Sequence, residues 1–446
     1  MKERLQEAAS ERITEMERDH VDLAIVIPAL HEAENLDLLL PQLRDILATL
    51  DASYEILIVD RTPDEQTQTL AETYGARLLD QQQRGYGAAL VMAFREVQAH
   101  FILTMDADLS HPPLYIHDMW RRRQEADVII ASRYTAGGQY EMPLLRSLLS
   151  RILNLFFSRG LDLKVRDMSS GFRLYKARAV QSLNLRQRDF DVLQEILVKA
   201  HAGGWTIKEV PFNYVPREHG SSHARVLAFG LSYLRTFRSL YRLRNSILSA
   251  DYDARAHDSI VLPQRYWQRQ RYRHITTLLR GEGPTLDVGS GSSRIIAALP
   301  SGSVAVDILL PKLRYSRRYG AMLAHASGFQ LPFAAESFPC VLCSQVIEHV
   351  PKESPILDEL DRVLAPGGAL VLGTPDYANW EWRFTEAVYQ RVLPSAYADE
   401  HISHYTRAEL IRLFTQRGYQ LEATRYILRG ELILKFRKPS RSLSRG

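Results

Sequence analysis

Two aspartates follow one apolar run of the chain, in the stretch FILTMDADLSHPP. A spacing of two would place Asp106 and Asp108 on one face of a strand, just past its carboxyl end. Open α/β sheets bind their ligands in the crevice at that end. Two carboxylates there suit a hard divalent cation that takes its other ligands from water and a diphosphate. The alternative is that both residues only cap the turn that His-Pro-Pro predicts.

A glycine-rich turn in the stretch TLDVGSGSS marks a second candidate site. Gly289 and Gly291 let the backbone approach a ligand without a clash from Cβ. Asp307 closes the next predicted strand, where it could accept hydrogen bonds from a ribose. Asp287 before the turn, and Ser293 where a third glycine would stand, differ from the usual dinucleotide fingerprint.

A third group of candidates follows in the same half of the chain. Glu348 and His349, in VIEHV, come at the carboxyl end of a predicted strand, where His349 could take a proton from a hydroxyl acceptor. The alternative is that the pair only caps a junction. His401 and His404, in EHISHYT, suggest a metal site, but no third ligand of clear spacing lies nearby. We therefore interpret this stretch as a loop before a helix that Thr406 caps.

Two series of elements must position these residues. Short apolar runs such as DLAIVIPAL, YEILIVD and FILTMDAD alternate with helix-length amphipathic segments, a pattern typical of buried parallel strands in βαβ units. A second series begins at GPTLDVGSGSS and continues through SVAVDIL, PCVLCSQV and GALVLGTP. The fold class is therefore α/β, with two domains. We place the first domain at residues 20–245, a basic amphipathic helix and linker at 246–280, and the second domain at 281–438.

Composition limits the class of protein. A chain of 446 residues with 46% hydrophobic and 24% charged residues has the make-up of a globular protein that is too long for one core. Two cysteines cannot form a disulfide framework. The charged N-terminal stretch lacks the apolar segment of a signal peptide, and arginines interrupt the most apolar long stretch. We expect a cytoplasmic protein without a membrane span.

Positive charge is concentrated near the middle of the chain. Residues 225–280 contain eleven arginines and three aspartates, although the net charge of the whole chain is only +4. Arg235, Arg238 and Arg242 share one face of a predicted helix with an apolar stripe beside them, as in helices that lie at a membrane interface. The alternative is that the stripe packs on the first domain and the arginines face solvent. No recognition module for nucleic acid accompanies the charge.

Seven motifs occur in one order over most of residues 20–225. They are VIPALHEAENL, IVD, RGYGAAL, MDADLSHPP, ASRYTAGG, DMSSGFRLY and EVPFNYVPREHGSS. This ordered series resembles the dolichol-phosphate mannose synthase group of family-2 glycosyltransferases.

The resemblance implies a GT-A fold that binds a nucleoside-diphosphate sugar, with Mg²⁺ or Mn²⁺ on Asp106 and Asp108. It also implies polyprenyl phosphate as the acceptor, and hence a peripheral enzyme that works at the cytoplasmic face of a membrane. The residues that match the nucleotide pocket are Pro28, Glu32 and Asp60, and those that match basic positions near the phosphates are Arg133, Arg173 and Arg217.

One loop departs from that family. Arg61 and Thr62 follow Asp60 where relatives carry a second acidic residue and Gly-Ser, so the identity of the base stays open. The acceptor class also stays open. A hydroxyl acceptor would need a general base such as Asp189, Asp191 or Glu195, whereas a lipid phosphate is already anionic at neutral pH.

The second half resembles class I S-adenosylmethionine-dependent methyltransferases over about residues 280–435, through the glycine-rich turn, VIEHV and LDELDRVLAPGGALVLGTP. The resemblance implies a Rossmann-like domain. Asp287, Gly289 and Gly291 would hold the methionine end of S-adenosylmethionine, and Asp307 the ribose. Ser327 stands where relatives often have an aspartate near the adenine.

The sequence therefore predicts a bifunctional enzyme, in which inverting transfer of a sugar to polyprenyl phosphate is joined to methylation of a related glycan or lipid. The alternative is a glycosyltransferase for hydroxyl acceptors whose second domain is an inactive binding or scaffold module.

Overall fold

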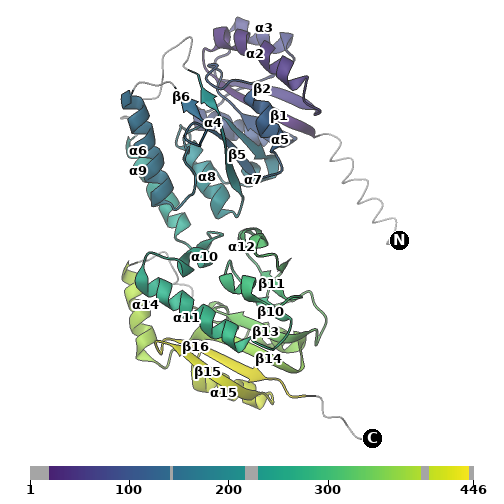
Figure 1. Ribbon diagram of the computed structural model, residues 1–446, viewed down its shortest axis with the longest axis vertical. Helices are drawn as coiled ribbons and strands as arrows, with labels where there is room; N and C mark the ends of the chain where they lie inside the picture. Colours follow the sequence, from purple (N-terminus) through teal and green to yellow (C-terminus); the bar gives the residue numbers. More distant parts are fainter. Residues whose placement is uncertain (1–19, 141–143, 216–229, 393–400, 441–446) are drawn as a thin grey trace, which may run out of the picture. The chain divides into compact units, whose positions relative to one another are not determined.

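The computed structural model describes residues 20–140, 144–215, 230–392 and 401–440 (Figure 1). The described chain divides into two compact units, with the boundary along the chain between Tyr241 and Arg242. Each unit is built around its own seven-stranded sheet, which confirms the predicted pair of α/β domains.

The sheet of the first unit has the strand order β3-β2-β1-β4-β7-β5-β8. Strands β3, β2, β1 and β4 are parallel, and β7 is antiparallel to both of its neighbours. The strands are β1 (Val21–Ala29), β2 (Tyr54–Asp60), β3 (Arg77–Asp80), β4 (Ala99–Thr104), β5 (Val128–Ser132), β7 (Arg173–Lys176) and β8 (Ile207–Pro211). A separate pair is formed by β6 (Gln139–Tyr140) and β9 (Asn213–Tyr214).

Helices cover both faces of this sheet, because alternate residues of the central strands enter two different cores. Leu23 and Ile25 of β1 face one core, and Ala24 and Val26 face the other. The first core is closed by α2 (Ala33–Leu47), α3 (Glu65–Thr73) and α5 (Tyr115–Arg121), and the second by α4 (Tyr86–Glu96), α7 (Ala177–Gln181) and α8 (Val192–Ala202). The chain order reverses at β1, so the crevice beside its carboxyl end is a topological switch point.

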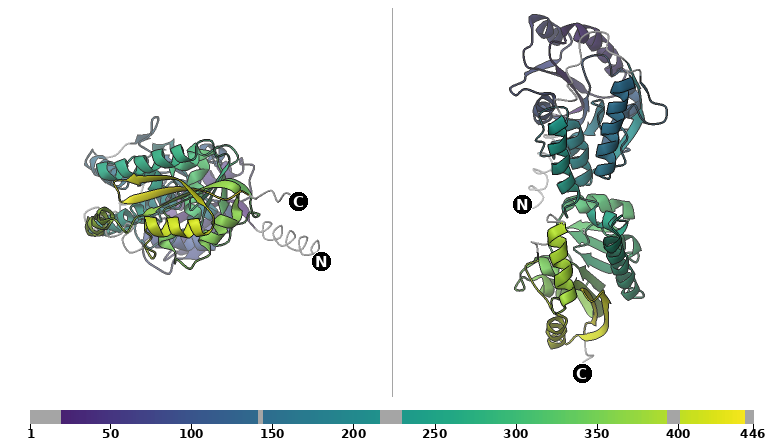
Figure 2. Two further views of the ribbon diagram at one scale, coloured as in Figure 1. Left: turned by 90° about the horizontal axis from the view of Figure 1, so that it is seen from below. Right: turned by 90° about the vertical axis from the view of Figure 1, so that its left-hand side faces the viewer.

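Two further helices, α6 (Leu144–Gly160) and α9 (Gly230–Arg244), lie side by side in Figures 1 and 2. The ring of Phe237 on α9 packs 4.3 Å from that of Phe156 on α6. Asp191 accepts hydrogen bonds from Ser232 Oγ at 2.9 Å and Thr236 Oγ1 at 2.7 Å, which fixes α9 to the start of α8. Phe237 of the apolar stripe therefore packs on the first unit, whereas Leu234 and Tyr241 of the stripe are 60% and 44% exposed.

The arginines of that helix point away from this contact. Arg235, Arg238 and Arg242 are exposed, as both alternatives required. The helix ends at Arg244, so it precedes the stretch 246–280 that we expected to contain it. None of the helices in the described residues combines the length and the apolar character needed to span a bilayer.

The second unit has the strand order β12-β11-β10-β13-β14-β16-β15, in which β16 runs antiparallel to both of its neighbours and the other pairs are parallel. The strands are β10 (Thr285–Val288), β11 (Val304–Asp307), β12 (Met322–His325), β13 (Phe338–Ser344), β14 (Leu364–Pro375), β15 (Gln420–Ile427) and β16 (Glu431–Arg437). The switch point here is at β10, directly before the glycine-rich turn.

Helices again cover both faces. The remaining elements are α10 (Tyr252–His257), α11 (Leu262–Leu278), η1 (Arg294–Ala298), α12 (Leu310–Ser316), η2 (Arg317–Tyr319), η3 (Ile347–His349), α13 (Ile356–Val363), α14 (Trp380–Val392) and α15 (Arg407–Gln416). The stretch 246–280 is thus mainly helical and belongs to the second unit. Thr406 caps α15 through its side chain, as the sequence predicted.

Candidate functional site

The two aspartates of the first unit lie in the loop after β4. The strand ends at Thr104, so Asp106 and Asp108 do not share a face of a strand as we predicted. The loop instead turns sharply at Leu109, whose φ of 61° is in the left-handed region. Asp106 and Asp108 nevertheless lie past the carboxyl end of β4, as predicted. The turn at Leu109 sets the direction of their loop.

Asp106 is the more accessible of the two, with 30% of its side chain exposed. Its Oδ1 lies 3.2 Å from the hydroxyl of Tyr86, and burial together with the Asp106 charge raises the pKa of that tyrosine, so Tyr86 is a neutral donor. A Cβ on Gly171 would lie 2.6 Å from Tyr86 Oη and 3.3 Å from Asp106 Oδ1. The motifs RGYG and SSGFR therefore meet at Asp106, and glycine is needed at 171 for that approach.

Asp108 is only 3% exposed. Its Oδ1 accepts hydrogen bonds from the backbone N–H of Ser110 at 3.1 Å and from Ser110 Oγ at 2.5 Å. His111 stands beside both carboxylates: its Nδ1 accepts from the N–H of Asp106 at 3.0 Å, and its ring stacks on Phe172. Burial lowers the pKa of His111, against the raising effect of the two aspartates, so this imidazole is neutral.

The three residues predicted to line the nucleotide pocket lie at the neighbouring strand ends. Pro28 and Asp60 lie in the last residues of β1 and β2, where Pro28 pairs with Val59 and Ala29 pairs with Asp60. Asp60 is 1% exposed, and its Oδ1 accepts the N–H of Thr62 at 2.9 Å. Glu32 precedes α2 and accepts a hydrogen bond from Asn35. These residues share the carboxyl edge of the sheet with the aspartate loop.

Arg133 forms a buried ion pair with Asp167. Its Nε and Nη2 each lie 2.8 Å from one oxygen of Asp167, and its backbone N–H donates to the same carboxylate. Burial disfavours both charges, but their attraction outweighs it: the pKa of Asp167 is lowered and that of Arg133 is raised. The guanidinium fixes the loop after β5 to the DMSSGF segment and has 11% of its side chain exposed.

Arg173 is fully buried. Its Nη1 donates to the carbonyl of Leu193 at 2.8 Å and its Nη2 to the carbonyl of Met168 at 2.9 Å. In this structure Arg173 binds backbone groups beneath the site, and our prediction that it contacts the phosphates is not supported by this geometry. Arg217 lies outside the described residues.

Two of the three carboxylates that could have been a general base have structural roles. Glu195 is 2% exposed, and its oxygens accept the N–H groups of Arg186 and Gln187 and pair with Lys199. Asp191 anchors α9. Only Asp189 remains, half-buried, with its Oδ1 2.9 Å from where a Cβ on Gly85 would lie.

The residues around the aspartate loop fit a hard divalent cation. The donor set consists of carboxylate oxygens, and one of the two carboxylates is partly open to solvent. Coordination by two carboxylates leaves positions for water and for phosphate oxygens, which is how Mg²⁺ is usually bound beside a nucleotide.

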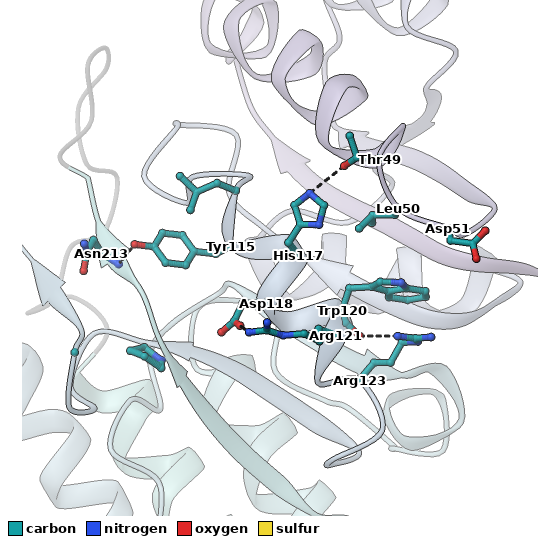
Figure 3. Close-up of a pocket in the computed structure, with 13 residues that line it drawn as sticks. Thr49, Leu50, Asp51, Tyr115, His117, Asp118, Trp120, Arg121, Arg123 and Asn213 are labelled. Atoms are coloured by element: carbon teal, nitrogen blue, oxygen red, sulfur yellow. Dashed lines mark hydrogen bonds and ion pairs between the residues drawn. The ribbon is translucent and has the colours of Figure 1, made fainter.

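A cavity of about 770 Å³ lies elsewhere on the first unit, beside α5 (Figure 3). None of the predicted site residues lines it. Several of its polar groups are paired with one another: His117 Nε2 lies 2.9 Å from Thr49 Oγ1, and the N–H of Asn213 donates to Tyr115 Oη. We assign it no role, and place the candidate site at the sheet edge.

The glycine-rich turn of the second unit follows β10, as predicted. Gly289 and Gly291 have φ values of 71° and 58°, which other residues adopt only with strain. A Cβ on Gly291 would lie 2.5 Å from Asp253 Oδ2, because Asp253 of α10 covers the turn. Asp253 also pairs with Lys312 at 2.8 Å, so the helix before the domain closes over its glycine turn.

The acidic residues of this site are close together and buried. Burial and the neighbouring Asp307 raise the pKa of Asp287 to about 7. Asp307 accepts the N–H of Gly291 and that of Leu309, each at 2.7 Å, while Ser327 accepts the N–H of Phe329 in a turn after β12. The turn also contains Ser290, a candidate site residue that we did not predict.

Ser290, between the two glycines, is 4% exposed, and its Oγ has no hydrogen-bond partner within the described part of the chain. A buried hydroxyl of this kind fits a ligand with polar groups. The turn therefore suits S-adenosylmethionine, whose methionine end carries an ammonium and a carboxylate.

Glu348 and His349 lie in η3, directly after β13. Glu348 is fully buried, and burial together with the charge of Glu431 raises its pKa to about 8. The ring of His401 lies 4.9 Å from that of His349. The structure thus brings a third side chain to the VIEHV motif, which sequence spacing did not reveal.

Comparisons with known families agree with both halves. Residues 24–183 match the family model described as Glycosyl transferase family 2, and residues 286–372 match the model described as Methyltransferase domain.

Among curated proteins, a dolichol-phosphate mannosyltransferase of Pyrococcus furiosus is 31% identical over 231 residues, which are 50% of this chain and 63% of that protein. An undecaprenyl-phosphate mannosyltransferase of Micrococcus luteus is 29% identical over 210 residues, 44% of this chain and 85% of that protein. The chain thus spans less than two thirds of the first of these relatives. A glucosyl-3-phosphoglycerate synthase of Mycobacterium tuberculosis, solved with Mg²⁺ and UDP, aligns with 51% of this chain and 83% of its own at 17% identity, with a TM-score of 0.41.

We predict that Asp167→Asn destabilises the first unit by roughly 3 kcal/mol at pH 7, because it leaves the Arg133 guanidinium buried without its counter-charge. The lowered pKa of Asp167 means that this stability is present above the unfolded pKa of about 4 and is lost as the pH falls through the folded pKa. Chemical denaturation at several pH values measures both effects.

Asp45→Asn is the matched control, because Asp45 pairs with Arg44 on the exposed surface. It should change stability by no more than about 0.5 kcal/mol. Equal stability of the two variants at pH 7 would contradict a stabilising role for the buried pair.

Proposed function

We propose that this chain, which joins a family-2 glycosyltransferase domain to a methyltransferase domain, transfers a sugar from a nucleoside-diphosphate sugar to polyprenyl phosphate and methylates a related glycan or lipid. The observation that carries the first half is the convergence of Tyr86, Asp106 and Gly171 at the carboxyl edge of the sheet.

A diphosphate leaving group gains negative charge as the bond to the sugar breaks, so a cation placed at its oxygens stabilises the transition state. Asp106 and Asp108 would hold Mg²⁺ or Mn²⁺, which supplies that charge when bound. Tyr86 keeps the Asp106 carboxylate in place and Ser110 keeps that of Asp108. Asp60 and Glu32 lie at the adjoining strand ends, where a nucleoside would bind.

The basic contacts to the phosphates come from other residues than Arg133 and Arg173, since both are used inside the protein. Arg217 keeps its proposed role. Arg84 is a further candidate, because it is exposed and lies two residues before Tyr86.

A phosphate acceptor agrees with how the carboxylates are used. Glu195 and Asp191 are both held by hydrogen bonds within the protein, so neither is available to take a proton from a hydroxyl. A lipid phosphate needs no base, and in-line attack by its oxygen inverts the anomeric carbon as the nucleoside diphosphate departs.

An exposed apolar stripe on α6 supports a lipid acceptor. Four large apolar side chains at helical spacing are 42–55% exposed, namely Leu148, Ile152, Leu155 and Phe156. Exposed arginines flank them on α6 and on α9. An apolar stripe with a basic border is typical of a surface that lies on an anionic bilayer. We propose that this face brings the enzyme to its acceptor.

In the second domain we propose that Ser290, Asp287 and the two glycines hold the methionine end of S-adenosylmethionine and that Asp307 holds the ribose. The end of β13, with His349, would then face the methyl acceptor. Methyl transfer depends mainly on proximity and alignment, so few catalytic groups are needed.

Asp108→Asn should lower sugar transfer by about 10²-fold or more, because it weakens the cation that stabilises the leaving diphosphate. The assay supplies polyprenyl phosphate, Mg²⁺ or Mn²⁺, and a panel of nucleotide sugars. Binding of S-adenosylmethionine should be unchanged, and Asp45→Asn should retain full transfer. Undiminished transfer by Asp108→Asn would refute the cation role.

Asp189→Asn separates the proposal from the hydroxyl-acceptor alternative. Of the three carboxylates considered, Asp189 is the one that no hydrogen bond or ion pair holds within the described part of the chain, so a hydroxyl acceptor would require it. Transfer to polyprenyl phosphate should persist in this variant. If wild-type protein uses no donor with polyprenyl phosphate but glycosylates a hydroxyl acceptor in an Asp189-dependent way, the alternative is correct.

The double variant Leu148→Asp, Ile152→Asp should bind vesicles containing phosphatidylglycerol at least about tenfold more weakly than wild type, because two half-exposed apolar side chains no longer enter the bilayer. Co-sedimentation measures this. Leu114→Asp is the control, since Leu114 is 58% exposed but lies before α5. Equal binding of the double variant and wild type would exclude the α6 stripe as the docking face.

Ser290→Ala should weaken S-adenosylmethionine binding several-fold without destabilising the domain, because its Oγ makes no hydrogen bond within the described chain. Isothermal titration and thermal unfolding measure the two effects. Ser354→Ala, which removes another buried and unpaired hydroxyl away from the turn, is the control. No detectable heat from wild type at millimolar cofactor would favour the inactive binding or scaffold module.

A further inference from the structure

Three side chains able to bind a metal converge beside the end of β13. Glu348, His349 and His401 each place one ligand atom within 4.8 Å of those of the other two. In the part of the chain that the structure describes, this is the one such group of three. It lies outside the aspartate loop and belongs to the other domain.

The cluster is held together by its own backbone. The carbonyl oxygen of Glu348 accepts the N–H groups of Ile402 and Ser403, at 2.8 and 2.9 Å. The segment that carries His401 is therefore joined directly to the VIEHV segment. This contact places the three side chains without help from a ligand.

The hydrogen bonds of His401 determine which ring nitrogen can bind a metal. Its Nδ1 lies 3.1 Å from Glu386 Oε1 and 2.7 Å from Tyr377 Oη. Tyr377 donates its own proton to Glu386 at 2.9 Å, so its oxygen can only accept from His401 Nδ1–H. The Nε2 atom is then unprotonated. A carboxylate on the far nitrogen is the usual support of a metal-binding histidine.

The carboxylate of Glu348 lacks sufficient partners. Its Oε2 accepts from Thr374 Oγ1 at 3.2 Å, while its Oε1 has no hydrogen-bond partner in the described residues, although the side chain is fully buried. A buried carboxylate oxygen without a partner fits a ligand such as a cation, because buried polar atoms are normally paired.

We propose that Glu348, His349 and His401 bind a divalent transition-metal ion, for which Zn²⁺ is the natural probe. Two imidazoles and one carboxylate favour such an ion over Mg²⁺, which prefers oxygen ligands. Three protein ligands leave at least one coordination position open, as in catalytic zinc sites.

The VIEHV segment that carries two of the three ligands also contacts the cofactor turn. Val346, two residues before Glu348, packs on Gly289 so closely that a Cβ there would lie 2.2 Å from Val346 Cγ2. The ion would thus hold a hydroxyl oxygen of the methyl acceptor beside the methyl donor and lower the pKa of that hydroxyl, whose proton would pass to water as the oxygen takes the methyl group from the sulfur. This replaces the proton-accepting role that we predicted for His349, since a nitrogen bound to a metal cannot also be a base. The acceptor role rests on the proposed methyl transfer, whereas metal binding does not.

The test uses the full-length chain in an Asp106→Asn, Asp108→Asn background, which removes the first domain's cation ligands. Chelator-treated protein is titrated with Zn²⁺ by calorimetry. We expect one tight site, lost on adding Glu348→Gln or His401→Gln. Glu386→Gln, which touches only the positioning of His401, should weaken binding by about 10- to 100-fold. His325→Gln, an exposed histidine of the same domain, should have no effect.

Zn²⁺ should also raise the unfolding temperature of the background protein and of His325→Gln, but not that of His401→Gln. If His401→Gln and Glu348→Gln bind and are stabilised by Zn²⁺ like the background protein, the metal site is refuted. Calorimetric titration of the same samples with S-adenosylmethionine distinguishes the proposed metal site from the proposed methyl transfer. Cofactor binding without a Zn²⁺ site overturns only this inference, and a Zn²⁺ site without cofactor binding overturns only the methyltransferase assignment.

Discussion

A buried charge must find a counter-charge, a set of hydrogen-bond donors or a ligand, and this constraint organises both domains. Asp167 is neutralised by Arg133, Glu195 by two backbone N–H groups and Lys199, and Asp253 by Lys312. Each of these carboxylates is satisfied within the protein and fixes a loop. Asp106, which is partly open, and Glu348, whose Oε1 has no hydrogen-bond partner in the described residues, are among the carboxylates to which we assign ligands.

The sheets bring such groups together by topology. In both units the order in which the chain adds strands to the sheet reverses at a central parallel strand, β1 or β10, and the loops on either side of that point meet at the carboxyl edge. The two domains share no loop motif, yet each places acidic residues at or just past the carboxyl ends of its strands and glycines where a close approach is needed. The chemistry differs because the loops differ.

Much of this could be predicted from the sequence. Apolar runs in alternation with amphipathic segments predicted both sheets, and ordered motifs predicted the aspartate loop and the glycine turn. The partners of individual side chains could not be predicted. Arg133 and Arg173 stand in motifs that suggest phosphate contacts, but their burial depends on residues such as Asp167 and Leu193, which only the folded chain brings near. The sequence did not reveal a third ligand to accompany His401, because Glu348 is more than fifty residues away. Backbone hydrogen bonds of the folded chain bring the two residues together.

The clamp between Asp191 and α9 has a thermodynamic consequence. Phe190, the residue before Asp191, stacks on Tyr86 with 4.7 Å between the ring centroids, and Tyr86 contacts Asp106. A shift of α9 would therefore reach the metal-facing carboxylate through a short chain of packed groups. If the lipid acceptor favours one position of α9, its affinity and that of the cation become linked, and each must change the other by the same factor. The exposed face formed by α6 and α9 would then affect binding of the ion, in addition to docking the enzyme on the membrane.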